Sequence, residues 1–180
     1  MKKVTLIIGL LLSGFSAKSQ TEFNHSGGIT LSMVNDHDGN EQLPGFTYNP
    51  RFDYILKDEI SIGVSAYPTI GGIGSSSYSS RDGGDGGMST FITLPIVAQI
   101  NFGHHSSTES RSNFGGFFGA GFNLARYSDY GNMSGINVQG GIKFLIKDQS
   151  YGIRVEYTKV LGSNSGINVL GLGLMMNIQR

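Results

Sequence analysis

The sequence predicts an all-β fold, specifically an eight-stranded antiparallel up-and-down transmembrane β-barrel. Three observations support this prediction: apolar and polar residues alternate over segments of strand length, the polar positions carry glycine and charged side chains, and the N-terminal segment has the features of an export signal. Successive side chains of a strand point to opposite faces, so each segment has one apolar and one polar face. In a membrane barrel the apolar faces meet lipid and the polar faces line the interior.

Length and composition fit one small barrel domain. The chain has 180 residues, of which 28 are glycine and 14% are charged. Low charge and high glycine content are unusual for an ordinary soluble domain, but glycine leaves room for bulky neighbours inside a narrow barrel. The chain has no cysteine, which excludes disulfides, thiol catalysis and cysteine-based zinc sites.

Residues 1–19 are predicted to be a signal peptide. Two lysines precede the apolar segment 4–12, and Ala17 and Ser19 are small residues suited to cleavage after Ser19. The apolar segment falls within the roughly 7–15 residues of a signal sequence and far below the roughly 20 that span a bilayer as a helix. The alternative, a buried N-terminal helix, agrees less well with these features. Residues 20–180 are then the barrel domain.

Removing this leader makes the chain mildly acidic. Lys2, Lys3 and Lys18 are lost, so 10 basic and 13 acidic residues remain, a net charge of −3. No basic surface for nucleic acid is therefore expected.

The clearest strand pattern spans residues 136–158. Apolar residues alternate with polar ones on both sides of a short polar segment at 147–149. Two such strands joined by a tight turn form an antiparallel hairpin. Lys143, Arg154 and Glu156 all fall on the polar face of this hairpin, where a narrow barrel interior would hold them.

Six further segments show the same alternation. Together with the hairpin, the expected strands are 29–33, 46–56, 60–67, 92–102, 114–124, 136–144, 151–158 and 167–178. An even number of strands places both termini on one side of the membrane, here the periplasmic side. Pro50 lacks an N–H group, so we expect a bulge or local break in its strand.

The predicted connections between strands are of two kinds, long loops and short turns. Segments 35–45, 69–88 and 125–134 are rich in turn-forming residues, and 69–88 is a low-complexity Gly/Ser tract. They are predicted to be external loops that offer a binding surface for an extracellular partner. Residues 57–59 and 147–149 are predicted periplasmic turns.

Five charged residues fall on the predicted interior faces: Arg51, Asp53, Lys143, Arg154 and Glu156. The interior of an eight-stranded barrel is just wide enough to be filled by side chains, and charges removed from water must be paired. We therefore interpret the five residues as a structural salt-bridge network. The alternative is a proton or ion path through a wet interior.

No catalytic, metal or cofactor site is predicted. The histidines are His25, His37, His104 and His105, and Glu109 is the carboxylate nearest to the adjacent pair. Neighbouring residues of a strand face opposite ways, so the pair does not form a metal site by itself. A Ser–His pair like that of a lipid-modifying enzyme arises easily by chance in a serine-rich chain.

The chain resembles the small outer-membrane β-barrel domains of Gram-negative bacteria, the OmpA/OmpX-like and especially the PorT-like group. The resemblance rests on the leader, on the strand TLPIVAQINF at 93–102, on the glycine-rich segment 119–122 and on VEYT at 155–158. It implies an outer-membrane location, contact with outer-membrane lipid and insertion by the barrel-assembly machinery. The chain departs from the family by ending in Ile178-Gln179-Arg180 rather than in an aromatic residue.

The sequence thus favours a non-enzymatic outer-membrane barrel with a structural, surface-interaction or assembly role. Two alternatives stay open. One is a small lipid-modifying enzyme with a site at the barrel rim. The other is a soluble lipocalin-like carrier, which would turn its apolar faces inward.

Overall fold

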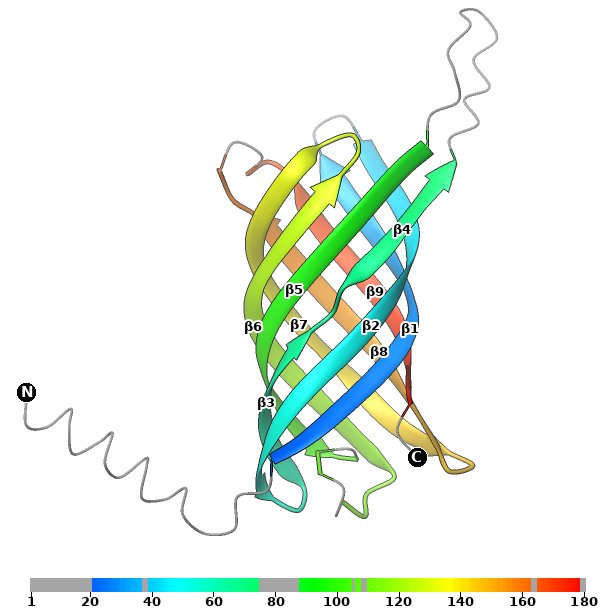
Figure 1. Ribbon diagram of the computed structural model, residues 1–180, viewed down its shortest axis with the longest axis vertical. Helices are drawn as coiled ribbons and strands as arrows, with labels where there is room; N and C mark the ends of the chain where they lie inside the picture. Colours follow the sequence, from blue (N-terminus) through cyan, green and yellow to red (C-terminus); the bar gives the residue numbers. More distant parts are fainter. Residues whose placement is uncertain are drawn as a thin grey trace, which may run out of the picture.

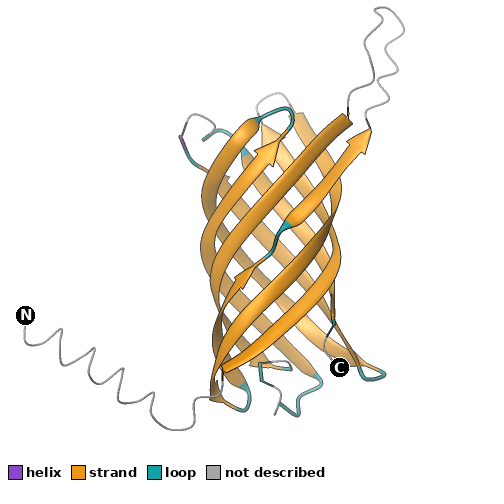
Figure 2. Cartoon of the chain, viewed as in Figure 1, coloured by secondary structure: helices purple, strands orange, loops and turns teal. Residues whose placement is uncertain are grey.

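A computed structural model describes residues 21–36, 39–74, 88–104, 106–107, 110–162 and 165–178. These residues form a tall barrel of tilted strands (Figures 1 and 2). No helix among them is long and apolar enough to cross a membrane. The predicted signal peptide lies outside the described residues.

Antiparallel strands make up nearly all of the described chain. They are β1 (Thr21–Asp36), β2 (Gly39–Lys57), β3 (Ile60–Ala66), β4 (Thr69–Gly74), β5 (Met88–Gly103), β6 (Phe114–Tyr127), β7 (Gly131–Ile146), β8 (Gln149–Val160) and β9 (Asn168–Asn177). The first strand starts and the last strand finishes at one end of the barrel, here called the terminal end (Figure 1). The opposite end is called the far end.

The strands close into a ring. Each strand pairs with the next along the chain except β3 with β4, and β1 also pairs with β9, which joins the two edges of the sheet. Nine strands fill eight positions, because β3 and β4 both lie between β2 and β5. The predicted eight-stranded antiparallel barrel is confirmed.

The interruption between β3 and β4 coincides with three prolines. The Tyr48 N–H donates to the Pro68 carbonyl at 3.1 Å, and the Tyr67 N–H donates to the Pro95 carbonyl at 3.1 Å. Pro50 lies two residues beyond Tyr48, so its ring nitrogen, which cannot donate, faces the same neighbouring strand. The register between β1 and β2 runs unbroken through Pro50. The predicted irregularity is therefore located in the neighbouring strand rather than in β2 itself.

The hairpin of β7 and β8 is confirmed with a shorter turn than predicted. Ile146 pairs with Gln149, which leaves Lys147 and Asp148 as the two turn residues. Their φ angles are 47° and 65°. Positive φ at both positions is what a two-residue turn needs to follow the twist of its strands.

Most of the three predicted external loops is strand, so those loop boundaries were wrong. In 35–45, β1 and β2 stay paired up to Asp36 and Gly39. In 69–88, the first six residues form β4, and 75–87 lie outside the described residues. In 125–134, only 128–130 separate β6 from β7. Turn-forming residues have only a weak preference against strands, so two neighbouring strands can stay hydrogen-bonded through a segment that contains them.

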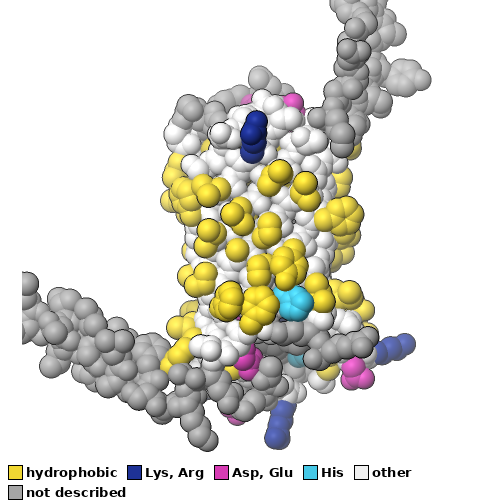
Figure 3. All heavy atoms as spheres, in the orientation of Figure 1, with side chains coloured by type: hydrophobic (Ala, Val, Ile, Leu, Met, Phe, Trp, Pro, Cys, Tyr) yellow, Lys and Arg dark blue, Asp and Glu magenta, His cyan; other side chains and the backbone are white. Residues whose placement is uncertain are grey.

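Through most of the barrel the apolar side chains face outward. Phe46, Phe52 and Phe118 have exposed fractions of 73%, 67% and 63%. On the face shown in Figure 3, hydrophobic side chains form a broad band over the middle, with charged side chains above and below it. A lipocalin-like carrier would show the opposite pattern, so that alternative was wrong.

At the far end the pattern reverses. Seven apolar side chains point inward there and are buried together, and we call them the apolar plug: Val34, Leu43, Phe91, Tyr127, Met133, Val160 and Val169. The outward positions next to them are mixed. Ile92 and Leu161 are apolar, with exposed fractions of 57% and 43%, whereas six others are polar: Gln42, Thr90, Arg126, Asn132, Lys159 and Asn168. This part of the barrel thus has an apolar interior, as a soluble protein has, and an outer face that carries polar as well as apolar residues.

Candidate functional site: the barrel interior

Asp53 lies at the centre of the polar interior near the terminal end. Its Oδ2 accepts hydrogen bonds from Asn24 Nδ2 at 2.8 Å and from Arg51 Nε at 2.5 Å. Its Oδ1 accepts from Asn101 Nδ2 at 3.1 Å. Gly63 faces this carboxylate from β3, and a Cβ atom there would collide with Asp53 Oδ1. The glycine therefore makes room for the carboxylate.

A chain of side-chain amides continues from Asp53 across the interior. Asn101 Oδ1 accepts from Lys143 Nζ at 3.0 Å and from Gln99 Nε2 at 2.7 Å. Gln99 Oε1 accepts from Ser65 Oγ at 2.8 Å and from Gln139 Nε2 at 3.2 Å. Each amide bridges two strands or more, so these bonds tie the barrel walls together from within.

Arg154 forms a second charged group. Its guanidinium lies 4.4 Å from the ring centroid of Tyr67, within the range of a cation–π interaction. Arg154 Nε is 3.7 Å from Glu156 Oε2, and the arginine is 1% exposed. Ser65 Oγ and Tyr67 Oη lie 3.2 Å apart, within hydrogen-bonding distance, which links this group to the amide chain.

The structure places all five charged residues of the predicted network on inward-facing positions, in two groups. Arg51, Asp53 and Lys143 lie toward the terminal end and are joined through Asn101. Arg154 and Glu156 lie beside each other on β8. The five residues plus the amides form what we call the interior network.

Sequence reasoning did not single out three residues that connect the network. Asn101 and Gln99 are polar residues of the predicted strand 92–102, but neutral amides gave no reason to expect a bridging role. Tyr67 was placed at the end of the predicted strand 60–67, and nothing in the pattern indicated contact with Arg154. Only the barrel closure brings β3, β5 and β8 side chains together.

The apolar plug fills the interior at the far end. Phe91 and Tyr127 stack with ring centroids 5.5 Å apart, and their exposed fractions are 1% and 2%. Val34 and Leu43 pack in the same buried cluster from β1 and β2. Among the described residues the interior is thus polar toward the termini and apolar at the opposite end.

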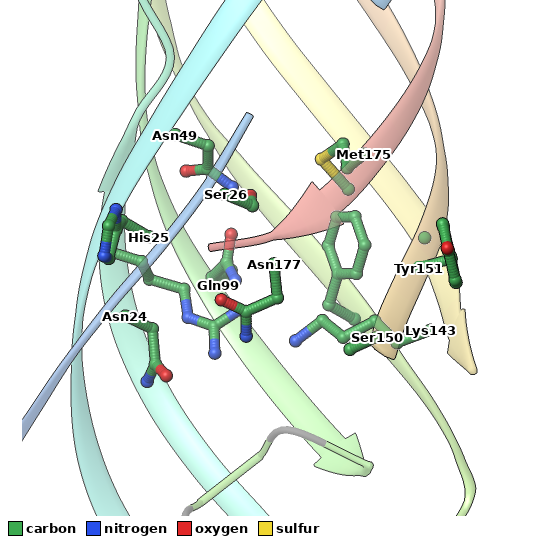
Figure 4. Close-up of a pocket in the computed structure, with 13 residues that line it drawn as sticks. Asn24, His25, Ser26, Asn49, Gln99, Lys143, Ser150, Tyr151, Met175 and Asn177 are labelled. Atoms are coloured by element: carbon green, nitrogen blue, oxygen red, sulfur yellow. The ribbon is translucent and has the colours of Figure 1, made fainter. Parts of the chain in front are cut away.

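A small cavity of about 40 Å³ lies in the polar interior, next to the point where β9 ends (Figure 4). Arg51 and Lys143 line it together with Asn24, Gln99 and Asn177. Figure 4 shows Lys143, Asn177 and Gln99 around this space, with side chains from β7, the end of β9 and β5. The cavity exceeds the roughly 10–15 Å³ that one water needs.

The two described histidines both lie toward the terminal end. His25 Nδ1 is 3.4 Å from Tyr48 Oη on the outer face. His104 follows β5, and its Nδ1 is 2.8 Å from the Ser112 main-chain oxygen. Burial lowers the pKa of the His104 imidazole, while the bond to Ser112 opposes this. The described residues contain no cluster of three or more acidic or histidine side chains able to hold a metal ion, and His37 and His105 lie outside them.

A closed barrel with an outward apolar band and a filled interior defines the class of small transmembrane β-barrels. No protein-family model matches the chain, and no curated protein matches its sequence. Solved structures of small outer-membrane β-barrels do match the fold.

Two of these structures are similar over nearly their whole length. Neisserial surface protein A has a TM-score of 0.55 at 13% identity, covering 89% of this chain and 99% of that one. Ail, the attachment invasion locus protein of Yersinia pestis, solved with the heparin analogue sucrose octasulfate, has a TM-score of 0.52 at 18% identity, covering 88% and 99%. At these identities the similarities show the fold and leave the activity open. The fold expected from the OmpA/OmpX-like resemblance is confirmed.

Proposed function

We propose that this chain is an integral protein of the bacterial outer membrane that acts without catalysis, as a structural or surface-interaction component. The observation that carries the proposal is the change of the outer face along the barrel. Apolar residues face outward over a broad central band, and at the far end polar residues such as Gln42, Thr90 and Asn132 face outward as well. A band of this kind suits lipid, and the more polar outer face above it suits water. Outer-membrane lipid and the barrel-assembly machinery are then the partners that this location requires.

In this proposal the interior network is structural. The Asp53 carboxylate accepts three hydrogen bonds, and Glu156 lies beside Arg154. Buried charges held in this way stabilise one arrangement of the surrounding strands. The apolar plug supports the same interpretation, because its packed side chains occupy the interior at the far end. A proton or ion path would need a continuous wet interior.

The far end supplies the surface for an extracellular partner, through segments 35–45, 69–88 and 125–134. These segments contain six acidic residues and two arginines: Asp36, Asp38, Glu41, Asp82, Asp85 and Asp129, against Arg81 and Arg126. Ail was solved with a polysulfated ligand, but a net charge of −4 would repel such a ligand here. The partner class favoured by this charge is a neutral or basic macromolecule.

The location is tested by cell fractionation together with gel mobility of the unboiled and boiled protein. We expect recovery in the outer-membrane fraction and a mobility that changes on boiling, because a closed barrel resists detergent until it is heated. Recovery in the soluble periplasm with no mobility change would overturn the proposal. A soluble periplasmic protein expressed in the same cells serves as the fractionation control.

The charge of the partner surface is tested with the purified barrel in detergent. We expect no saturable binding of sucrose octasulfate at physiological ionic strength. Binding of this ligand, lost on replacing Arg126 by Gln, would show that the local basic residue outweighs the acidic surroundings and would overturn the partner class.

A further inference from the structure

A groove on the outer face of the barrel lies near the far end, where polar residues join the apolar ones. It has a volume of about 580 Å³ and lies over β5, β6, β7 and the residues that follow β8. The pairing of the strands fixes its outline, because Leu124 of β6 lies opposite both Leu94 of β5 and Ser134 of β7. Its volume falls within the roughly 300–1,000 Å³ of small-molecule sites.

One part of the groove is apolar. Four exposed aliphatic side chains line it, and they come from three elements of the wall: Ile92, Leu94, Leu124 and Leu161. Ser134 is a short residue between them, and its main-chain carbonyl accepts from the Leu161 N–H at 2.8 Å. Aliphatic side chains around a short residue leave an elongated apolar hollow that suits an acyl chain.

The other part of the groove is polar and basic. Arg126 lies two residues beyond Leu124 toward the far end, on the same face of β6. Asn132 lies opposite Arg126 on β7, and both line the groove and are exposed. A guanidinium is permanently charged, and its planar set of donors matches phosphate. The side-chain amide of Asn132 adds two N–H donors.

The charge of Arg126 is available to a ligand. The ion pairs of the described barrel do not include this arginine. The acidic residue nearest to it along the chain is Asp129, whose Oδ2 accepts from Ser89 Oγ at 2.7 Å. The positive charge thus lies at the edge of an apolar hollow rather than within a described ion pair.

The order of the two parts along the barrel matches a membrane lipid. The apolar part lies toward the central band, where acyl chains would be, and Arg126 lies on the far side, at the level of the headgroups. A soluble polyanion would approach the far end across its acidic segments. A lipid phosphate reaches Arg126 from the side, within the membrane, so the acidic segments do not lie in its way.

We propose that this groove binds one phosphorylated membrane lipid. Its phosphate accepts hydrogen bonds from Arg126 and Asn132, and one acyl chain lies along Leu124 and Ser134. This inference rests on the outer-membrane location proposed above and adds a lipid class to it. The site holds a lipid at a fixed position on the wall, in contrast to the exchanging lipid around the rest of the band.

Fluorescence quenching by lipids with brominated acyl chains tests the site. The chain has no tryptophan, so Leu161→Trp places a single fluorophore at the edge of the groove. The barrel is inserted into phosphatidylcholine vesicles that contain equal amounts of brominated phosphatidic acid or brominated diacylglycerol. We expect phosphatidic acid to quench more strongly, because the two lipids differ by the phosphate. Ile142→Trp, on the outer face of β7 toward the terminal end, should be quenched equally by both. Equal quenching at both positions would overturn the proposal.

Replacement of the basic residue separates a built site from general attraction. In the Leu161→Trp barrel, Arg126→Gln should weaken the apparent affinity for phosphatidic acid by about tenfold or more, as loss of a bond to a charged group does. Lys159→Gln removes an exposed lysine of β8 that does not line the groove, and it should leave the affinity unchanged. Equal losses for the two variants would overturn the groove as the site.

Native mass spectrometry of the wild-type barrel provides a test without a variant. The purified barrel is mixed in detergent with phosphatidic acid and diacylglycerol of identical acyl chains. We expect one phosphatidic acid to stay bound after removal of the detergent, whereas diacylglycerol is lost. Equal retention or equal loss of the two lipids would overturn the lipid site. Cell fractionation tests the location separately, so a barrel found in the outer membrane without this preference would overturn the lipid site alone.

Discussion

The two halves of the barrel interior are both filled by side chains, but these are polar in one half and apolar in the other. Toward the termini, the space inside the strands holds the interior network, and the strands turn apolar residues to the outside. At the far end, the apolar plug fills the interior, and the outer face carries polar residues as well as apolar ones. The difference indicates that the medium around the strands decides whether apolar residues lie on their outer or their inner face. Where the wall meets lipid, polar groups must be satisfied inside, and where it meets water the hydrophobic effect drives apolar residues inward.

The largest effect is expected from removing the central charge of the interior network. Asp53→Asn leaves Arg51 and Lys143 without their carboxylate, which should lower the free energy of unfolding by about 3–5 kcal/mol. Urea titration followed by gel mobility of the unboiled protein measures this. Asp58→Asn, in the turn after β2, is the matched control and should change little. Equal midpoints for the two variants would contradict the central role of Asp53.

A somewhat smaller effect is expected at the far end. Phe91→Ala opens a cavity inside the apolar plug, and truncation of a buried phenylalanine costs about 3 kcal/mol or more. Phe118→Ala removes the same atoms from an outward position that is 63% exposed, so it should cost much less. The same urea titration compares the two variants. A larger loss for Phe118→Ala would contradict the assignment of the plug as a packed core.

The boundary between lipid and water can be located with outward-facing arginines. Ala120 lies in the middle of β6 and faces outward, so Ala120→Arg should cost about 2–4 kcal/mol near the bilayer midplane. Asn132→Arg, at the level of the plug, should cost about 0–1 kcal/mol as it does near a membrane interface. Refolding into vesicles and titrating with urea gives both values. Similar costs at the two positions would show that the reversal of the pattern does not mark the membrane boundary.

The smallest effect concerns pH. Burial holds the pKa of His104 below its ordinary value of 6.5 in the folded barrel, so the unfolded chain binds the proton more readily. Stability should therefore fall as pH drops from 6.5 toward the folded-state pKa. The urea midpoint of His104→Gln should depend less on pH over this window than that of the wild type. Parallel curves would rule out a contribution from His104.

Sequence periodicity predicted the barrel because a strand with lipid on one side alternates apolar and polar residues. Alternation assigned Lys143, Arg154 and Glu156 to interior faces, where the structure has them. Alternation was a poorer guide at the far end. Asn35 and Asn40 were predicted to lie in a loop, yet they pair with each other between β1 and β2. The preference of a residue for turns depends only on its local sequence, whereas this pairing depends on the neighbouring strand.

The interior contacts could not be predicted for a different reason. Asn101 bonds to residues on β2, β3 and β7 as well as to its own strand. Such contacts depend on which strands face one another across the closed barrel. The alternation along one strand predicts which side chains point inward, but not which other strands they meet. The apolar plug was missed because Phe91 and Tyr127 fall in or beside segments that were predicted to be loops.

The extension of paired strands at the far end has a consequence for recognition. Because β1 and β2 remain paired up to Asp36 and Gly39, the ends of the two strands hold each other in one arrangement before any encounter with a partner. Binding to a preorganised surface forfeits less conformational entropy than binding to a long free loop. Paired strand ends such as these thus favour a partner that recognises a fixed shape.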